Sequence, residues 1–247
     1  PEWYKNTRYS PDGYVRPYTR LKKLLAQSTV NYVDSSELYR QIGLYATFPK
    51  TGIHWNHLAS FESTRAVIDK YCELTGVNAR RLATNGVIET TKPPSVGGNS
   101  DTDIYNILYG TIDKSGSIMD EFYYAPDGYV VNSEDGEKIG VLVQGGSFTH
   151  DVINYLSKYR VTNKLQTFYY NQYSGQARYS PFGKMGYDAW DILLENIDLV
   201  IFEQTEQQIR GQFPTRETYA GETGNPYMGS NVVYASLYYY LKDNEIS

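Results

Sequence analysis

The chain has 247 residues, enough for one large α/β domain with a sizeable hydrophobic core. A net charge of -5 and the lack of a Lys/Arg cluster argue against a nucleic-acid partner. The single cysteine, Cys72, excludes an internal disulfide and a cysteine-based metal site, and its place in a helical pattern predicts a buried structural thiol. No apolar run approaches the length of a membrane span.

The sequence begins at Pro1 without a methionine, and no signal peptide is recognisable. We therefore expect a single domain over residues 1–247, excised from a longer protein whose targeting segment lies upstream. The composition is unusual in one respect, since the chain has 26 tyrosines. Tyrosine suits surfaces that stack on sugar rings, but it is also a good strand former, so both explanations stay open.

Short elements are predicted in the first part of the chain. In order they are a helix over 20–27, a strand over 30–34 that ends at Asp34, and a helix over 35–42 capped by Ser35 or Ser36. A long helix is expected next, because apolar side chains recur at helical spacing up to a glycine stop at Gly76. The apolar face of that helix consists of Leu58, Phe61, Ile68, Tyr71 and Cys72.

The middle of the chain is rich in turn signals. Residues 84–100 are predicted to form a loop with several Pro and Gly, and a short helix is expected over 103–109. Aromatic and β-branched runs on either side of Pro126-Asp127-Gly128 predict a β-hairpin.

Residues 139–157 contain the most informative pattern. A short apolar, β-branched run predicts a buried strand, the glycines Gly145 and Gly146 break it, and Ser147 follows at the start of a helical pattern. A strand, a tight glycine turn carrying Ser and a helix form the geometry of a nucleophile elbow. The ordinary alternative is that Ser147 simply caps the helix.

The C-terminal part predicts further alternation of strands and helices. In order it contains a strand near 167–170, a loop over 171–186, a helix over 187–196, a buried strand over 198–202 and a helix or strand around 231–241. Strands that alternate with helices imply a mainly parallel, doubly wound sheet.

Three histidines are available for chemistry, namely His54, His57 and His150. His54 and His57 are spaced i,i+3, but no third ligand and no H-E-x-x-H signature accompany them, so we expect no metal site. His150 follows Ser147 by three residues and should point away from its hydroxyl, which makes it a poor base. His54 lies in the loop just before the long helix.

Open α/β sheets bind ligands at the carboxyl ends of their strands. Ser147, Asp34 and the pair Glu203-Gln204 each follow a predicted strand, so they could share one crevice. Simpler explanations exist for two of them, because Glu203 could pair with an arginine and Asp34 could cap a helix.

Two short blocks resemble the AlgX/AlgJ-like SGNH hydrolases, relatives of the alginate O-acetyltransferases and of the bacterial DHHW proteins. Residues 48–56 (FPKTGIHWN) are similar to the K-T-D-x-H-W block of that family, and residues 145–148 (GGSF) take the place of its later G-D-S-F block. The order of the two blocks agrees, and residues 30–34 and 198–206 also look similar. The resemblance covers most of residues 28–206.

The resemblance implies an SGNH-hydrolase-like three-layer sandwich with a mainly parallel sheet, and acyl-ester chemistry without a cofactor. By matched position, Ser147 would be the nucleophile and His54 the general base. The chain departs from the family at Gly52 and Gly146, where the family has aspartates. Because Gly52 has no side chain, another carboxylate would have to serve as the acid of the triad.

Candidate partners for the Ser-His pair follow from the same reading. Asp101 and Asp103, in the loop after Asn99, are the first candidates for the acid, and Glu203 is another. Oxyanion or substrate contacts are expected from Gly146, Asn99, Glu203 and Trp55.

The expected function is an SGNH-like O-acetyltransferase or acetylesterase that acts on a bacterial extracellular polysaccharide. A membrane protein that donates acetyl groups is a candidate partner. The expected location is extracytoplasmic, in the periplasm or at the cell surface, with any membrane anchor in a segment outside this chain. The rival is an inactive glycan-binding protein that retains the fold, favoured by Gly52 and by the many tyrosines.

Overall fold

The protein is described from a computed structural model. The structure describes residues 17–42, 47–48, 54–90, 123–127, 130–132, 135–170, 172–175, 178–181, 189–205 and 226–244. The predicted helix over 103–109 and the end of the predicted loop over 84–100, from residue 91 onwards, lie outside these residues.

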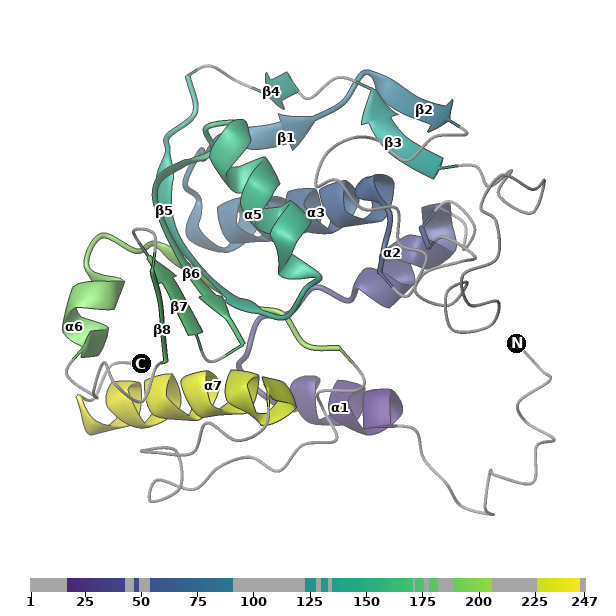
Figure 1. The fold of residues 1–247 in the computed structure, drawn as a ribbon. Helices are drawn as coiled ribbons and strands as arrows, with labels where there is room; N and C mark the ends of the chain where they lie inside the picture. Colours follow the sequence, from purple (N-terminus) through teal and green to yellow (C-terminus); the bar gives the residue numbers. More distant parts are fainter. Residues whose placement is uncertain are drawn as a thin grey trace, which may run out of the picture.

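A five-stranded sheet lies at the centre of the molecule (Figure 1). Its order is β8-β7-β6-β5-β9, and the strands span β5 (Ile139–Gly145), β6 (Thr162–Tyr169), β7 (Gln172–Gly175), β8 (Arg178–Pro181) and β9 (Leu199–Phe202). β6, β5 and β9 are parallel, whereas β7 and β8 are antiparallel additions next to β6. The expected parallel sheet is therefore present as three strands, with a hairpin on one side.

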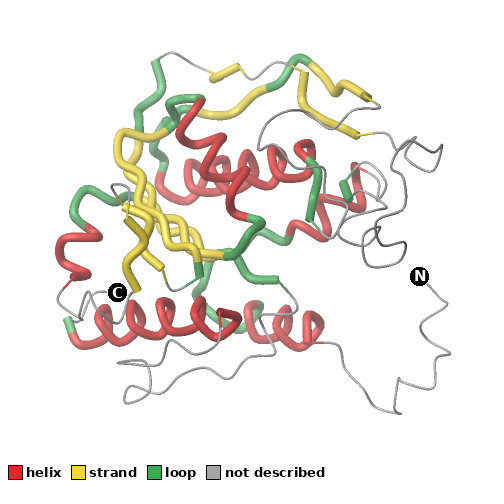
Figure 2. The backbone as a smooth tube through the Cα atoms, viewed as in Figure 1, coloured by secondary structure: helices red, strands yellow, loops and turns green. Residues whose placement is uncertain are grey.

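Helices cover both faces of this sheet, as Figure 2 shows. They are α3 (His57–Thr75) and α5 (Thr149–Lys158) on one face, and α6 (Ala189–Leu194) and α7 (Pro226–Asp243) on the other. β5 is buried along its whole length. Val141 and Val143 pack in the core formed with α3 and α5, and Leu142 packs in the core formed with α6 and α7. This alternation explains the continuous apolar run of β5, since a central parallel strand has no solvent face.

The long helix α3 forms as the sequence predicts. Asn56 caps its N-terminus by accepting a hydrogen bond from the N–H of Ala59, and Gly76 ends it in the left-handed conformation, at φ 74°. Cys72 is buried on its core face beside Ile68, so the prediction of a buried thiol is confirmed.

The two predicted N-terminal helices are confirmed, but the prediction of a strand between them is wrong. α1 (Pro17–Leu25) and α2 (Ser35–Ile42) form, whereas residues 30–34 make no ladder in the described structure. Val30 and Tyr32 are exposed, so the alternating pattern has no core to face. The predicted caps Ser35 and Ser36 are also wrong, because Asp34 accepts a hydrogen bond from the N–H of Ser36 and caps α2.

Four short strands correct the prediction for the middle of the chain. They are β1 (Arg81–Ala83), β2 (Gly86–Thr90), β3 (Tyr123–Asp127) and β4 (Val130–Asn132). The predicted hairpin between the last two is wrong, since β3 pairs with β2 and β4 pairs with β1. The predicted loop over residues 84–90 is also wrong, because these residues include β2. The partner of β2 is β3, more than thirty residues away in sequence, and a local pattern does not reveal that partner.

The C-terminal half agrees with the sequence except at two places. The predicted loop over 171–186 contains the strands β7 and β8, and β9 is half-buried rather than buried. The region around 231–241 is resolved as a helix, α7. None of the helices in the described ranges has both the length and the hydrophobicity that a membrane span requires.

Candidate active site

The glycine turn after β5 leads directly into α5 and forms the predicted strand–turn–helix. β5 ends at Gly145, and Gly146, Ser147 and Phe148 follow before α5 begins at Thr149. Ser147 therefore lies at the carboxyl end of the central strand and is partly exposed. This is the edge at which open α/β sheets bind ligands.

The hydroxyl of Ser147 is hydrogen-bonded to His54, with 2.6 Å between Oγ and Nε2. The prediction that the two side chains lie within hydrogen-bond reach is confirmed. The alternative, in which Ser147 caps α5, is wrong: the N-cap residue is Phe148, and it makes no side-chain cap bond. His54 can accept the serine proton in the tautomer that carries hydrogen on Nδ1.

The imidazole of His54 packs against one end of a row of aromatic rings. The ring of Phe148 lies 5.0 Å from that of His54 and 5.4 Å from that of Trp55, between ring centroids. Trp55 in turn meets Tyr39 edge to face at 6.4 Å. Trp55 thus packs against Phe148, the ring that contacts His54, and its predicted contact with substrate stays a prediction.

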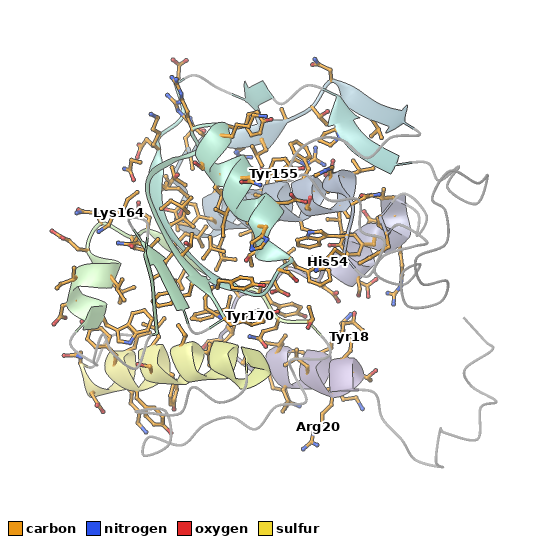
Figure 3. The ribbon with its side chains drawn as sticks, viewed as in Figure 1. Tyr18, Arg20, His54, Tyr155, Lys164 and Tyr170 are labelled. Atoms are coloured by element: carbon orange, nitrogen blue, oxygen red, sulfur yellow. The ribbon has the colours of Figure 1, made fainter. Side chains whose placement is uncertain are left out.

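Contacts between α3 and α5 fix the separation of His54 and Ser147, because each helix begins just after one of the two residues. The hydroxyl of Tyr155 on α5 donates to the backbone oxygen of His57 at 2.9 Å (Figure 3). The hydroxyl of Ser60 on α3 donates to Asp151 at 3.2 Å. These hydrogen bonds between the helices preorganise His54 and Ser147, whose relative geometry matters for proton transfer.

Glu203, which lies just after β9, is hydrogen-bonded to the glycine turn. Its Oε2 accepts a hydrogen bond from the N–H of Gly146 at 2.8 Å, and its own N–H donates to the backbone oxygen of Gln144 at 2.8 Å. Burial raises the pKa of the Glu203 carboxyl, while the Gly146 hydrogen bond and the charge of His54 act to lower it. The alternative of an arginine partner finds no support within the described residues.

Gly146 cannot serve as an oxyanion donor in this arrangement, because its N–H is already bound to Glu203. The prediction for Gly146 is corrected on this point. The N–H groups of Thr149 and His150 are also engaged, with the oxygens of Gly146 and Ser147. In the described part of the chain no hydrogen bond occupies the N–H groups of Ser147 and Phe148, which makes them the candidate oxyanion donors.

Gly145 is a site residue whose necessity the sequence did not reveal. A Cβ at this position would lie 2.7 Å from both Cβ and Oε2 of Glu203 and 2.4 Å from Cγ2 of Thr149. One neighbour is the first residue of α5 and the other follows β9, so only glycine allows β5 and Glu203 to approach in this way. The Gly145-Gly146 pair predicts a strand break and a tight turn, but it does not reveal that Glu203 approaches Gly145 so closely.

The structure removes other residues from the candidate site. Asp34 does not end a sheet strand; it is hydrogen-bonded to Tyr18 and Ser36 and paired with Lys22. Gln204 is exposed, and so is His150, which stacks on Tyr169 instead of approaching the serine. Asp34 therefore caps a helix, the simpler of the two explanations.

Several predicted site residues cannot be placed. Asn99, Asp101, Asp103 and Gly52 lie outside the described residues. The identity of the triad acid thus stays a prediction.

A metal centre finds no basis in the described residues, which contain no group of three or more His, Cys, Asp and Glu side chains suited to a metal ion. His57 instead faces Asp151, with 3.4 Å between Nδ1 and Oδ2. The site instead pairs a hydroxyl with an imidazole, which is the nucleophile and base that acyl transfer can use.

Comparisons with protein-family models, curated proteins and solved structures find no match for this chain. A functional proposal therefore depends on the residues of the site and on their geometry.

Proposed function

We propose that the protein is a serine-dependent O-acetyltransferase or acetylesterase of the SGNH type that acts on a bacterial extracellular polysaccharide. The observation that carries the proposal is the 2.6 Å contact between His54 Nε2 and Ser147 Oγ at the carboxyl end of β5. The two residues are 93 positions apart in sequence, and each matches a block of the SGNH-like family that it resembles.

The proposed reaction begins when His54 takes the proton of Ser147 as Oγ attacks the carbonyl carbon of an acetyl ester. The carbonyl oxygen becomes an oxyanion, which the N–H groups of Ser147 and Phe148 stabilise, with Asn99 as a further candidate donor. The intermediate collapses to acetyl-serine, and His54 returns the proton to the departing oxygen.

The second half of the reaction repeats these steps with a new nucleophile. His54 deprotonates a sugar hydroxyl or a water molecule, which attacks the acetyl-serine and regenerates Ser147. The acceptor that reaches the intermediate decides between a transferase and an esterase. In the transferase case, the acetyl donor is a membrane protein or a small ester on the extracytoplasmic side.

The triad acid in this proposal is a carboxylate from the 99–103 loop, Asp101 or Asp103, because Gly52 has no side chain. Glu203 is less suitable for that part. Its Oε2 is bound to the Gly146 N–H, and its burial favours the neutral form. Glu203 instead holds the turn on which Ser147 lies.

A glycan-binding protein without catalysis is the second candidate. The observation that favours it is Gly52, at the position where the resembled family has its acid. In that case the Ser-His contact would remain as part of a ligand site.

Acetate release from 4-nitrophenyl acetate and from O-acetylated xylohexaose tests the proposal. Ser147→Ala and His54→Ala should abolish release, and a fluorophosphonate should label the wild type but not Ser147→Ala. Ser157→Ala is the matched control, because Ser157 is an exposed serine near the other end of α5. Wild-type turnover in Ser147→Ala would end the enzyme proposal.

A further inference from the structure

Tyr170 has an unusual backbone immediately beside the nucleophile strand. Its φ is 54°, in the left-handed region that a bulky side chain rarely adopts. The residue follows the last residue of β6, Tyr169, which is in register with Gly145 at the end of β5. Tyr170 and His54 lie at the same end of the sheet (Figure 3).

Two hydrogen bonds to β5 hold this conformation. The N–H of Tyr170 donates to the oxygen of Gly145 at 2.8 Å, and the oxygen of Tyr170 accepts from Gln144 Nε2 at 3.1 Å. Gln144 is fully buried in a strand that is otherwise apolar or glycine, and its Oε1 has no hydrogen-bond partner in the described part of the chain. A buried amide with an unsatisfied oxygen costs stability, as does a left-handed tyrosine.

These costs are concentrated at the backbone of Tyr170, which is bonded to Gly145, two residues before Ser147. The ring of Tyr170 lies 4.6 Å from that of Tyr169, and His150 stacks on Tyr169 at 5.1 Å. His150 is exposed, and both tyrosines are partly exposed. We call His150, Tyr169 and Tyr170 the aromatic platform.

We propose that the aromatic platform binds a pyranose ring of the glycan whose acetyl ester reaches Ser147, with Tyr170 as the main stacking residue. Sugar rings expose a flat face of C–H groups that packs on an aromatic ring, while the phenol hydroxyl can bond to a sugar hydroxyl. The inference rests on the proposed function, since it assigns the subsite that presents the ester to the Ser-His pair. Gln144 is a positioning residue that acts through the backbone of Tyr170.

Binding is tested in Ser147→Ala protein, so that turnover does not interfere. The probes are three hexasaccharides, one each of xylose, mannuronic acid and N-acetylglucosamine, in acetylated and unmodified form. Saturation-transfer NMR and calorimetry measure their binding. Adding Tyr170→Gly removes the ring and suits the left-handed backbone, so the fold should keep its stability while the affinity for the bound hexasaccharide falls about tenfold, or roughly 1.4 kcal/mol. Tyr170→Phe should retain most of the affinity.

Tyr238→Ala is the matched control, because it removes an exposed tyrosine ring from α7. It should leave the affinity for the hexasaccharides unchanged. If Tyr170→Gly binds every hexasaccharide as tightly as the parent protein, or if the parent binds none of them, the platform is not a sugar subsite.

Kinetics separate this inference from the proposed function. In Tyr170→Gly the ratio of kcat/KM for the acetylated hexasaccharide to kcat/KM for 4-nitrophenyl acetate should fall about tenfold, because only the first substrate has a sugar ring. If the wild type releases acetate but the ratio is unchanged in Tyr170→Gly, the sugar subsite is refuted and the proposed enzyme function still stands. If hexasaccharide binding depends on Tyr170 but no acetate is released, the proposed enzyme function is refuted and the sugar subsite still stands.

Discussion

Gly146 donates its N–H to Glu203 Oε2 at 2.8 Å, which ties the turn that carries Ser147 to the end of the neighbouring strand β9. Glu203 is partly exposed, desolvation of its carboxyl raises the pKa, and its backbone N–H bonds to β5 as well. Glu203 therefore positions the nucleophile without touching the reacting atoms. Its side chain and its ionisation can be tested separately.

Glu203→Ala should lower the free energy of unfolding by about 1–3 kcal/mol, because the Gly146 N–H would be left buried and unsatisfied. Glu203→Gln keeps an acceptor for that N–H and should retain most of the stability. Urea denaturation at one pH measures both, and equal losses in the two variants would contradict the role of the hydrogen bond.

The pH dependence of Glu203→Gln provides a second test. The pKa of Glu203 is raised in the folded state, so its contribution to stability is fully present below the unfolded pKa and is lost as the pH rises through the folded pKa. Gln cannot ionise. The stability of Glu203→Gln relative to the wild type should therefore increase from about pH 4 upwards, and a difference that stays constant with pH would refute the buried ionisation.

Gly145→Ala should destabilise the fold by about 1–3 kcal/mol and disturb the elbow, since the new Cβ would overlap Glu203 and Thr149. Gly86→Ala is the matched control, because no atom lies within 4 Å of a Cβ built there, and it should change stability by less than about 0.5 kcal/mol. Thermal unfolding compares the two. A Gly145→Ala protein as stable and as active as Gly86→Ala would show that the turn is loosely packed.

The double variant Ser147→Ala/His54→Ala should be about as inactive as either single variant. Each single change should reduce kcat for acetate release by roughly 10³-fold or more, and the losses should not add, because the pair acts as a unit. Multiplicative losses would mean that His54 assists some other group than Ser147.

The triad acid is tested by separate changes in the loop and at the glycine. Asp101→Asn or Asp103→Asn should lower kcat by up to about 10⁴-fold, whereas Gly52→Asp should gain little. The opposite result, with no loss in either loop variant and a large gain in Gly52→Asp, would mean that the acid has been lost and that the binding-protein function is the better one.

Asp34→Ala should lower the free energy of unfolding by about 1 kcal/mol through loss of the α2 cap. Partial burial acts to raise the pKa of Asp34, but hydrogen bonds from Ser36, Tyr18 and Lys22 outweigh it and bring the pKa to about 2. Its stabilisation is therefore present above the unfolded pKa and is lost as the pH falls towards 2. Acetate release at neutral pH should not change, because Asp34 lies outside the candidate site.

The sequence predicted those features that depend on nearby residues. β5, the glycine turn and α5 are continuous in the chain, and α3 ends at the predicted stop, Gly76. The contact between His54 and Ser147 was expected because two family-like blocks occur in the right order. Long-range pairing was not expected, since the partner of β2 is β3 and no local turn records that choice.

The contribution of Glu203 could be predicted only in part. Its place after a strand indicated a position at the sheet edge, but its bond to Gly146 depends on β9 lying directly beside β5. A strand order is a tertiary property, and the composition of a single strand does not encode it. The same holds for Gln144, whose polar side chain looks like an error in an apolar strand until β6 and Tyr170 are in place.

β9 lies at the edge of the described sheet, pairs with β5 over only four residues, and is half-buried throughout. An edge strand of this kind can detach in a local opening that costs less free energy than global unfolding. Each such opening would remove Glu203 from Gly146 and expose that amide to solvent, so hydrogen exchange at Gly146 should report the docking of β9. The rate of heat inactivation would then follow the fraying of one short strand, while the cores around α3 and α7 are still folded.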